Sequence, residues 1–209
     1  MHLEDTVRNC IGSMIENIDG YYINLDRKNF NITSDAINLF EFMIKDDISN
    51  GDILEIGPGS GYICLKLYKY NKNITAVEIQ KDVYTSLKDN LNNNNNNRVH
   101  IKLLNEDIKK HVGKYKYIVT NPPYYKLNSG KYPIEEIKKY SKFEFYLNLE
   151  DLCKNLNRLL LDETSVFYIV YPLNRKEEVK FELKKNNLHI IREKIIGSLY
   201  YVSGSKTFS

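Results

Sequence analysis

The sequence predicts an α/β fold with a doubly wound, mostly parallel sheet of seven strands. From residue 52 onward, short apolar segments typical of buried strands alternate with segments of helical length. Residues 188–207 hold two strand patterns and no room for a crossover helix, so we expect an antiparallel hairpin at the C-terminal end. Residues 53–61 run from a buried strand directly into a glycine-rich turn. This order is typical of Rossmann-like sheets, which bind a ligand at the carboxyl ends of their strands.

Residues 51–209 are expected to form the main domain, in which strands and helices alternate. Strands are expected at residues 52–56, 74–79, 98–104, 115–120, 165–171, 188–196 and 199–207. Helices are expected at about residues 61–70, 81–90, 147–161 and 175–186. Between the second helix and the third strand, the asparagine run at residues 92–97 predicts an exposed loop.

Residues 1–50 are expected to form a short helix and hairpin extension that packs on this domain. Apolar side chains recur at helical spacing within residues 3–18 and predict a helix. Residues 21–32 then predict a hairpin with its turn at residues 26–29. A second helix follows, and three residues could cap its start: Thr33, Ser34 or Asp35.

The composition excludes several classes of protein. A net charge of +3, from 30 Lys+Arg against 27 Asp+Glu, permits a nucleic-acid partner without requiring one. Basic residues gather in two groups, Lys109, Lys110, Lys114 and Lys116, and then Lys126, Lys131, Lys138, Lys139 and Lys142. Scattered cysteines and histidines favour neither a disulfide framework nor a metal site. Without a signal peptide or an apolar run near the roughly 18 residues of a membrane span, we expect a cytoplasmic protein with no membrane partner.

The glycine-rich turn carries the strongest indication of function. Gly57, Gly59 and Gly61 allow positive φ angles and a close approach of the backbone to a ligand. Their spacing matches neither the dinucleotide pattern G-x-G-x-x-G nor a Walker A loop. Glu55, at the strand end, would repel a pyrophosphate and suits a ligand that carries an ammonium group. Residues 55–61 resemble the E/D-x-G-x-G-x-G loop of class I methyltransferases, which implies S-adenosyl-L-methionine as cofactor.

Acidic residues also follow the next two predicted strands. Glu78 lies at the end of the second strand, where a carboxylate can accept hydrogen bonds from both hydroxyls of a ribose. Taken alone, it could be an ordinary surface charge. Asp107 and Ile108 follow the third strand. The resemblance implies that Asp107 bonds the adenine amino group and that Ile108 packs on the ring, whereas a helix cap is the alternative for Asp107.

A loop after the fourth strand, Asn121-Pro122-Pro123-Tyr124, indicates the reaction. It resembles the motif of methyltransferases that act on planar nitrogens, whose lone pair is delocalised and poorly nucleophilic. The Asn121 side-chain oxygen and the Pro122 carbonyl can each accept one N–H bond from such an amine and favour its pyramidal form. The prolines keep the turn rigid. An ordinary Asn-Pro turn is the alternative.

Tyr124 offers the substrate a flat ring. A flipped base could stack on it, so we expect a Tyr124→Phe substitution to change little. We expect Asn121 to lie against the cofactor as well as the substrate.

Over most of its length the chain resembles the bacterial tRNA1(Val) adenine-N6 methyltransferases. The similar segments are residues 21–23 and 30–32 of the hairpin, the helix start at 33–39, the ribose motif at 77–80, the catalytic loop at 121–126 and the helix start at 149–152. The resemblance implies that Ile79 joins Glu78 in the cofactor site. It also implies methylation of the exocyclic N6 amine of an adenine in RNA, with tRNA favoured.

Other substrates are compatible with the same loop. Glutamine-N5 methyltransferases of peptide release factors share Asn-Pro-Pro-Tyr and act on an amide nitrogen, so a release factor is the alternative partner. A second alternative is an adenine in rRNA or DNA. A binding subunit that keeps the cofactor fold without activity is disfavoured because Asn121 is present.

Overall fold

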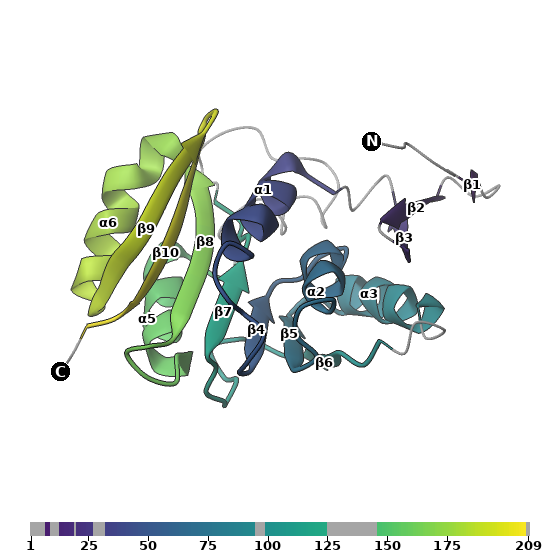
Figure 1. The fold of residues 1–209 in the computed structure, drawn as a ribbon, viewed down its shortest axis with the longest axis horizontal. Helices are drawn as coiled ribbons and strands as arrows, with labels where there is room; N and C mark the ends of the chain where they lie inside the picture. Colours follow the sequence, from purple (N-terminus) through teal and green to yellow (C-terminus); the bar gives the residue numbers. More distant parts are fainter. Residues whose placement is uncertain are drawn as a thin grey trace.

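A computed structural model describes residues 7–8, 13–18, 20–26, 32–94, 99–124 and 146–207 (Figure 1). The strands are β1 Val7–Arg8, β2 Ser13–Ile18, β3 Tyr21–Asp26, β4 Ile53–Ile56, β5 Ile74–Glu78, β6 Lys102–Asn105, β7 Tyr117–Thr120, β8 Val166–Pro172, β9 Leu188–Ile196 and β10 Leu199–Lys206. The helices are α1 Ser34–Met43, α2 Tyr62–Leu67, α3 Lys81–Asn93, α5 Leu149–Leu159 and α6 Lys176–Lys185, with a short 3-10 helix, η2, at Leu173–Arg175.

The main sheet confirms the predicted fold class. It has seven strands in the order β6-β5-β4-β7-β8-β10-β9. Strands β4 to β8 are parallel, whereas β10 pairs antiparallel with both β8 and β9. The order reverses between β4 and β7, so the loops that follow these strands diverge and leave a crevice at the carboxyl edge of the sheet.

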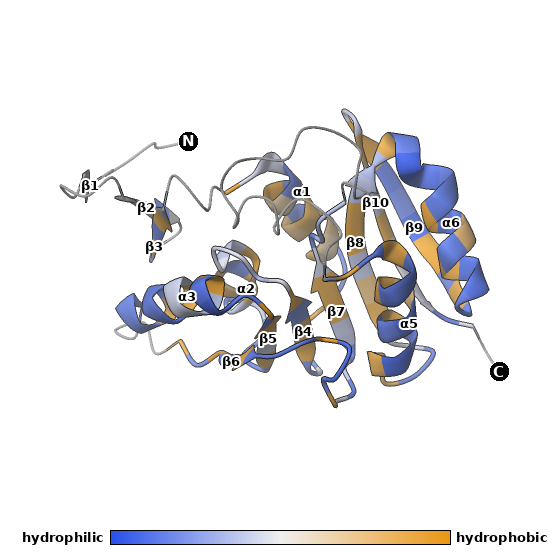
Figure 2. Ribbon diagram, turned by 180° about the vertical axis from the view of Figure 1, so that it is seen from behind, coloured by the Kyte–Doolittle hydropathy of each residue, from blue (hydrophilic) through white to orange (hydrophobic). Residues whose placement is uncertain are grey.

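Helices cover both faces of this sheet (Figure 1). Along β8, Tyr168 and Val170 belong to a hydrophobic cluster with α1, α2 and α3, whereas Phe167, Ile169 and Tyr171 belong to a second cluster with α5 and α6. This division follows from the alternation of side chains along a strand. Figure 2 shows hydrophobic residues along the central strands, where these two clusters meet the sheet.

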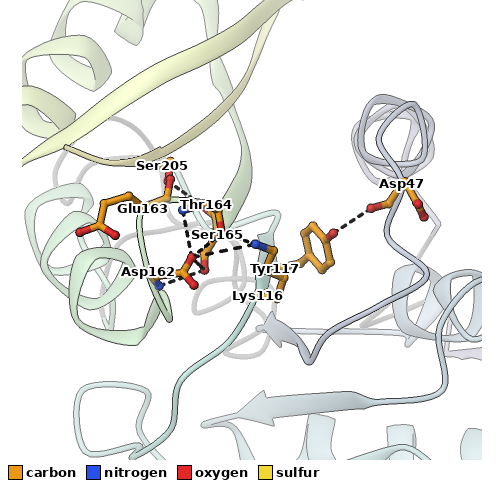
Figure 3. Close-up of polar contacts among 8 residues, drawn as sticks. All are labelled: Asp47, Lys116, Tyr117, Asp162, Glu163, Thr164, Ser165 and Ser205. Carbon is orange, nitrogen blue, oxygen red and sulfur yellow. Dashed lines mark hydrogen bonds and ion pairs between the residues drawn. The ribbon is translucent and has the colours of Figure 1, made fainter. Parts of the chain in front are cut away.

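The turn that leads into β8 is held by an aspartate (Figure 3). The Asp162 carboxylate accepts hydrogen bonds from the Thr164 amide, at 2.9 Å, and from the Ser165 hydroxyl, at 2.9 Å. The Ser205 hydroxyl oxygen of β10 lies 2.6 Å from the carbonyl oxygens of both Glu163 and Ser165, so its one proton can be donated to either of them. A short polar side chain that bonds its own backbone stabilises a tight turn without glycine.

The predicted helix over residues 3–18 is wrong wherever the structure describes that segment. Residues 13–18 form β2, which pairs antiparallel with β3, and the turn between them contains Gly20 with φ of 86°. These two strands form a hairpin that turns near Gly20. The turn predicted at residues 26–29 stays a prediction, because residues 27–31 lie outside the described ranges. The apolar spacing of a short segment fits both the periodicity of a helix and that of a strand, so pairing with a neighbouring strand decides its conformation.

The asparagine run is only partly the loop that its composition predicts. Helix α3 extends to Asn93, and Asn94 is 1% exposed. The Asn94 side chain accepts from the Tyr22 amide at 2.8 Å and donates to the Tyr22 carbonyl at 2.7 Å. Asn90, one turn earlier, pairs with the Asn24 amide and carbonyl in the same way, at 2.9 and 3.3 Å. The amide side chains of Asn90 in α3 and of Asn94, which caps its C-terminal end, thus pair with the free edge of β3. Residues 95–97 lie outside the described ranges.

The start of α1 confirms one of the three predicted caps. The Thr33 hydroxyl accepts from the Ala36 amide at 3.4 Å, and Asp35 lies in the first turn, where a negative charge is favourable. Within the described ranges no helix has the length and apolar character needed to span a bilayer.

Candidate functional site

An open cavity of about 720 Å³ lies at the carboxyl edge of the sheet. The described residues that line it come from the carboxyl ends of four neighbouring strands, β4, β5, β6 and β7, and from the segments that follow them, including Val83 of α3. Two further residues lie just before α5. The predicted site residues that line it are Gly57, Gly59, Glu78, Ile79, Asp107, Ile108, Asn121, Pro122 and Pro123. Glu55, Gly61 and Tyr124 are not among the described lining residues.

The three glycines of the turn have different surroundings. All have positive φ, at 66° for Gly57, 55° for Gly59 and 85° for Gly61. A Cβ atom at Gly57 or Gly59 would meet nothing described within 4 Å, whereas one at Gly61 would lie 2.4 Å from Leu87 Cδ1. The first two glycines therefore leave space on the cavity side, and Gly61 lets α2 pack against α3.

Glu55 lies behind the glycine turn instead of in the cavity. It is 2% exposed and contacts Cys64 of α2. Burial raises the pKa of its carboxyl to about 8, although the hydrogen bond with Cys64 acts in the opposite direction and lowers this pKa. Burial and the nearby Glu55 charge also raise the pKa of the Cys64 thiol well above its usual value. Glu55 is therefore largely protonated at neutral pH in the free protein.

Glu78 reaches the cavity from the end of β5. Its Oε1 accepts a hydrogen bond from the Gln80 amide at 2.8 Å, and the side chain is almost fully buried. Burial raises the pKa of this carboxyl to about 7, although bonds from backbone amides, among them those of Gln80 and Gly59, act in the opposite direction. The carboxyl group is therefore an acceptor placed beside the glycine turn.

The segment after β6 adds a second acidic wall. Asp107 lines the cavity, and its Oδ1 also accepts from the Lys109 amide at 2.9 Å, so it caps a turn at the same time. Its position is thus compatible with both interpretations made from the sequence, a contact with the adenine amino group and a cap. Glu106, which sequence reasoning missed, also lines the cavity and contacts the ring of buried His111. The other nitrogen of His111 lies 2.7 Å from the Tyr115 hydroxyl.

The loop after β7 forms a further part of the cavity wall. Thr120 precedes it, and its buried hydroxyl donates to the Ile56 carbonyl of β4 at 2.8 Å. Asn121, Pro122 and Pro123 line the cavity. The ring of Tyr124 turns toward the second hydrophobic cluster, with its centroid 6.5 Å from that of Tyr171.

Several lining residues were not predicted as site residues. They are Ile56, Val77, Gln80, Val83, Glu106, Thr120, Tyr146 and Leu147. Five of them, Ile56, Val77, Gln80, Glu106 and Thr120, are immediate neighbours of predicted site residues in the sequence. Tyr146 and Leu147 directly precede α5 in the sequence; residues 125–145 before them lie outside the described ranges. In the described part of the chain no group of three or more His, Cys, Asp or Glu side chains forms a metal site.

Comparisons with known proteins agree with this fold. The family model of the methyltransferase small domain matches residues 34–137. A Methanocaldococcus jannaschii protein named as a protein N5-glutamine methyltransferase is 28% identical over 82% of this chain and 93% of its own length. A tRNA1(Val) (adenine(37)-N6)-methyltransferase of Flavobacterium johnsoniae is 30% identical over 62% of this chain and 55% of its own length. The crystal structure of a Pyrococcus furiosus methyltransferase has a TM-score of 0.67 at 20% identity and covers 90% of each chain.

The curated relatives differ in how much of their length is matched. The chain spans nearly all of the archaeal relative but three fifths or less of the tRNA methyltransferases. Small-subunit rRNA methyltransferases are also similar, with at most 60% of their length matched. The fold, the cavity at the reversal of strand order and the matched domain agree on one conclusion. This chain is an S-adenosylmethionine-dependent methyltransferase of the methyltransferase small domain family.

Proposed function

We propose that the chain methylates the exocyclic N6 amine of an adenine in RNA, with tRNA as the favoured substrate, in the cytoplasm. One observation carries the chemistry. Asn121, Pro122 and Pro123 line the same cavity as Glu78 and Asp107, so a cofactor and an amine can meet there. Asn-Pro-Pro-Tyr in this position fits an attacking nitrogen that is planar in its resting state.

The described residues fit the cofactor. Gly57 and Gly59 leave open space where a side chain would otherwise project, and Glu78 offers a carboxylate for ribose hydroxyls. Asp107 and Ile108 would hold the adenine by a hydrogen bond and by packing. S-adenosylmethionine supplies an electrophilic methyl group when it is bound. Its positive charge also suits a cavity with three lining carboxyl groups, those of Glu78, Glu106 and Asp107.

Asn121 and Pro122 would act on the amine of the substrate. The amide oxygen of Asn121 and the carbonyl of Pro122 accept its two N–H bonds, which favours the pyramidal nitrogen that resembles the transition state. Positive charge develops on the nitrogen during attack, and both oxygens stabilise it. The proton is lost after transfer, so no strong base is required beforehand.

Two observations support adenine in RNA. The loop, the ribose motif and the start of α1 resemble those of the tRNA adenine-N6 methyltransferases, and two tRNA1(Val) enzymes are among the relatives. The tyrosine of the loop is also in contact with the start of α1, since the Tyr124 hydroxyl donates to Asp35 at 2.9 Å. The two resembling segments therefore form one structural unit.

Glutamine-N5 methylation of a protein is the second candidate. It is favoured by the archaeal relative, whose match extends over nearly the whole length of both chains. The chemistry would be the same, because an amide nitrogen is also planar and poorly nucleophilic.

Transfer of labelled methyl groups to total tRNA, rRNA and a peptide release factor, tested in parallel, distinguishes the candidates. We expect label in tRNA, recovered as N6-methyladenosine after digestion. Label confined to release-factor glutamine would replace the first candidate by the second. Absence of label in all three substrates, with S-adenosylhomocysteine binding intact, would contradict both.

A further inference from the structure

The hydroxyl of Tyr124 is held by a residue far away in the sequence. It donates to Asp35 Oδ2 at 2.9 Å, across a separation of 89 residues, in a partly buried contact. Asp35 lies in the first turn of α1 and is not among the described residues that line the cavity. A hydrogen bond to an ionised carboxylate is stronger than one between neutral groups.

The backbone of Tyr124 is held by a second residue, Arg175. The Nη1 of Arg175 donates to the Tyr124 carbonyl at 2.7 Å. The same guanidinium forms two bonds with the Glu178 carboxylate, at 3.1 and 2.8 Å, and lies 5.1 Å from the Tyr171 ring centroid. Arg175 is 8% exposed, so these partners leave it little freedom to move.

A third contact anchors the other end of the same loop. The Thr120 hydroxyl donates to the Ile56 carbonyl at 2.8 Å and joins the loop to β4. The segment between these anchors contains Pro122 and Pro123, whose φ angles are fixed by their rings. Anchors at both ends of a stiff segment restrict the position of Asn121 more than any single contact does.

We infer that Asp35 and Arg175 are positioning residues that clamp Tyr124 and thereby keep the oxygens of Asn121 and Pro122 in place for catalysis. The inference rests on the proposed role of this loop. A displacement of about 1 Å in a reacting group can lower a rate by about 10²-fold, so the clamp affects the rate of transfer more than binding. It also reverses the expectation that Tyr124→Phe is silent, because that substitution removes the hydroxyl that Asp35 accepts from.

The test compares Asp35→Ala, Tyr124→Phe and the double variant. We expect each single variant to lower kcat about tenfold or more, in line with the loss of a hydrogen bond to a charged group. The double variant should be no slower than the slower single variant, since both remove the same contact. Affinity for S-adenosylhomocysteine should change less than twofold, because neither side chain lines the cavity. Asp35→Asn, which keeps an acceptor oxygen, should recover part of the rate.

Two control variants separate positioning from a loss of stability. Thr33→Ala removes the cap of the same helix without touching Tyr124. Arg192→Lys is the control for Arg175→Lys, because Arg192 makes the same kinds of contact away from Tyr124. It forms two bonds with Asp46, donates to the Phe42 carbonyl at 2.7 Å and lies over the Phe42 ring. Both should keep kcat within twofold of wild type, whereas Arg175→Lys should lower it about tenfold, because an ammonium cannot reproduce the guanidinium fork.

Hydrogen-exchange mass spectrometry of the peptide that contains Tyr124 needs no substrate. Asp35→Ala and Arg175→Lys should each speed its exchange about tenfold, and the two controls should not. If wild type methylates none of the substrates tested, the proposed function fails while this measurement still decides the clamp. Unchanged exchange, or equal loss of kcat in Arg175→Lys and Arg192→Lys, would overturn the inference.

Discussion

Glu55→Gln tests the electrostatics beneath the glycine turn. Glu55 is 2% exposed, and its Oε2 has no hydrogen-bond partner among the residues that the structure describes. Burial raises the pKa of this carboxyl from an ordinary 4.5 to about 8. Glutamine has nearly the same shape but does not ionise, so the substitution removes the titration while it preserves the packing.

The size of the effect follows from the pKa difference. A carboxyl whose pKa is higher in the folded than in the unfolded protein favours folding below its unfolded pKa, and that contribution is lost as pH rises toward the folded pKa. With about 1.4 kcal/mol for each pKa unit, ionisation in the unfolded chain lowers the free energy of unfolding by about 2 to 3 kcal/mol between about pH 5 and pH 7. Glu78, whose pKa is about 7, titrates over part of the same range but does so in both proteins.

Urea denaturation across this pH range gives the free energy of unfolding as a function of pH for the cofactor-free wild type and for Glu55→Gln. The slopes of the two curves are then compared. We expect the free energy of unfolding of the wild type to fall by about 2 to 3 kcal/mol more than that of the variant. Equal slopes would mean that Glu55 is ionised in the folded protein and that its burial does not raise its pKa.

Calorimetry then tests whether Glu55 serves the ammonium group of the cofactor. If it does, the carboxyl must lose a proton when the cofactor binds. At pH 7, wild type should release up to about one proton and Glu55→Gln should release less, as measured in buffers of different ionisation enthalpy. Equal proton release would restrict Glu55 to a structural role.

Four further predictions concern the cavity and the hairpin. Gly59→Val should abolish S-adenosylhomocysteine binding in calorimetry, because its side chain enters the open space beside the turn. Glu78→Ala should weaken that binding by roughly 1.5–3 kcal/mol for each bond lost, and wild-type affinity should fall as pH falls through about 7, when the carboxylate is protonated. Asn121→Ala should lower kcat by about 10²–10³-fold in single-turnover assays with little change in cofactor affinity. Asn94→Ala should destabilise the protein by roughly 1–3 kcal/mol in urea and speed hydrogen exchange in β3.

Matched controls are available for two of these. Gly197 has φ of 59° and open space around it, so Gly197→Val carries the same backbone strain without reaching the cavity and should bind S-adenosylhomocysteine normally. Asn92 is exposed, and Asn92→Ala should leave stability unchanged. Binding by Gly59→Val would refute the assignment of the turn, pH-independent affinity would refute that of Glu78, and a near-normal rate of Asn121→Ala would refute the mechanism. Equal stability of Asn92→Ala and Asn94→Ala would contradict the pairing of α3 with β3.

The elements from residue 52 onward were predictable because their signals are local. Each strand is a short apolar run, each helix has its own periodicity, and β9 has the predicted bounds. Residues 13–18 were misassigned because their apolar spacing suits a helix as well as a strand, and the pairing with β3 decided between them. The asparagine run was misjudged for a related reason: Asn94 is buried only because β3 presents a free edge beside it.

The sequence by itself determined the class of fold and the class of enzyme, and it predicted the chemistry of the site. Glycines after one strand, acidic residues after the next two, and Asn-Pro-Pro-Tyr after the fourth are local features, and strand ends in a parallel sheet meet at one edge. Only the tertiary structure decided that Glu55 and Gly61 lie behind the cavity and that Asp35 and Arg175 hold Tyr124. These contacts join residues 51 and 89 positions apart, and they depend on strand order and helix packing, which spacing along the chain does not constrain.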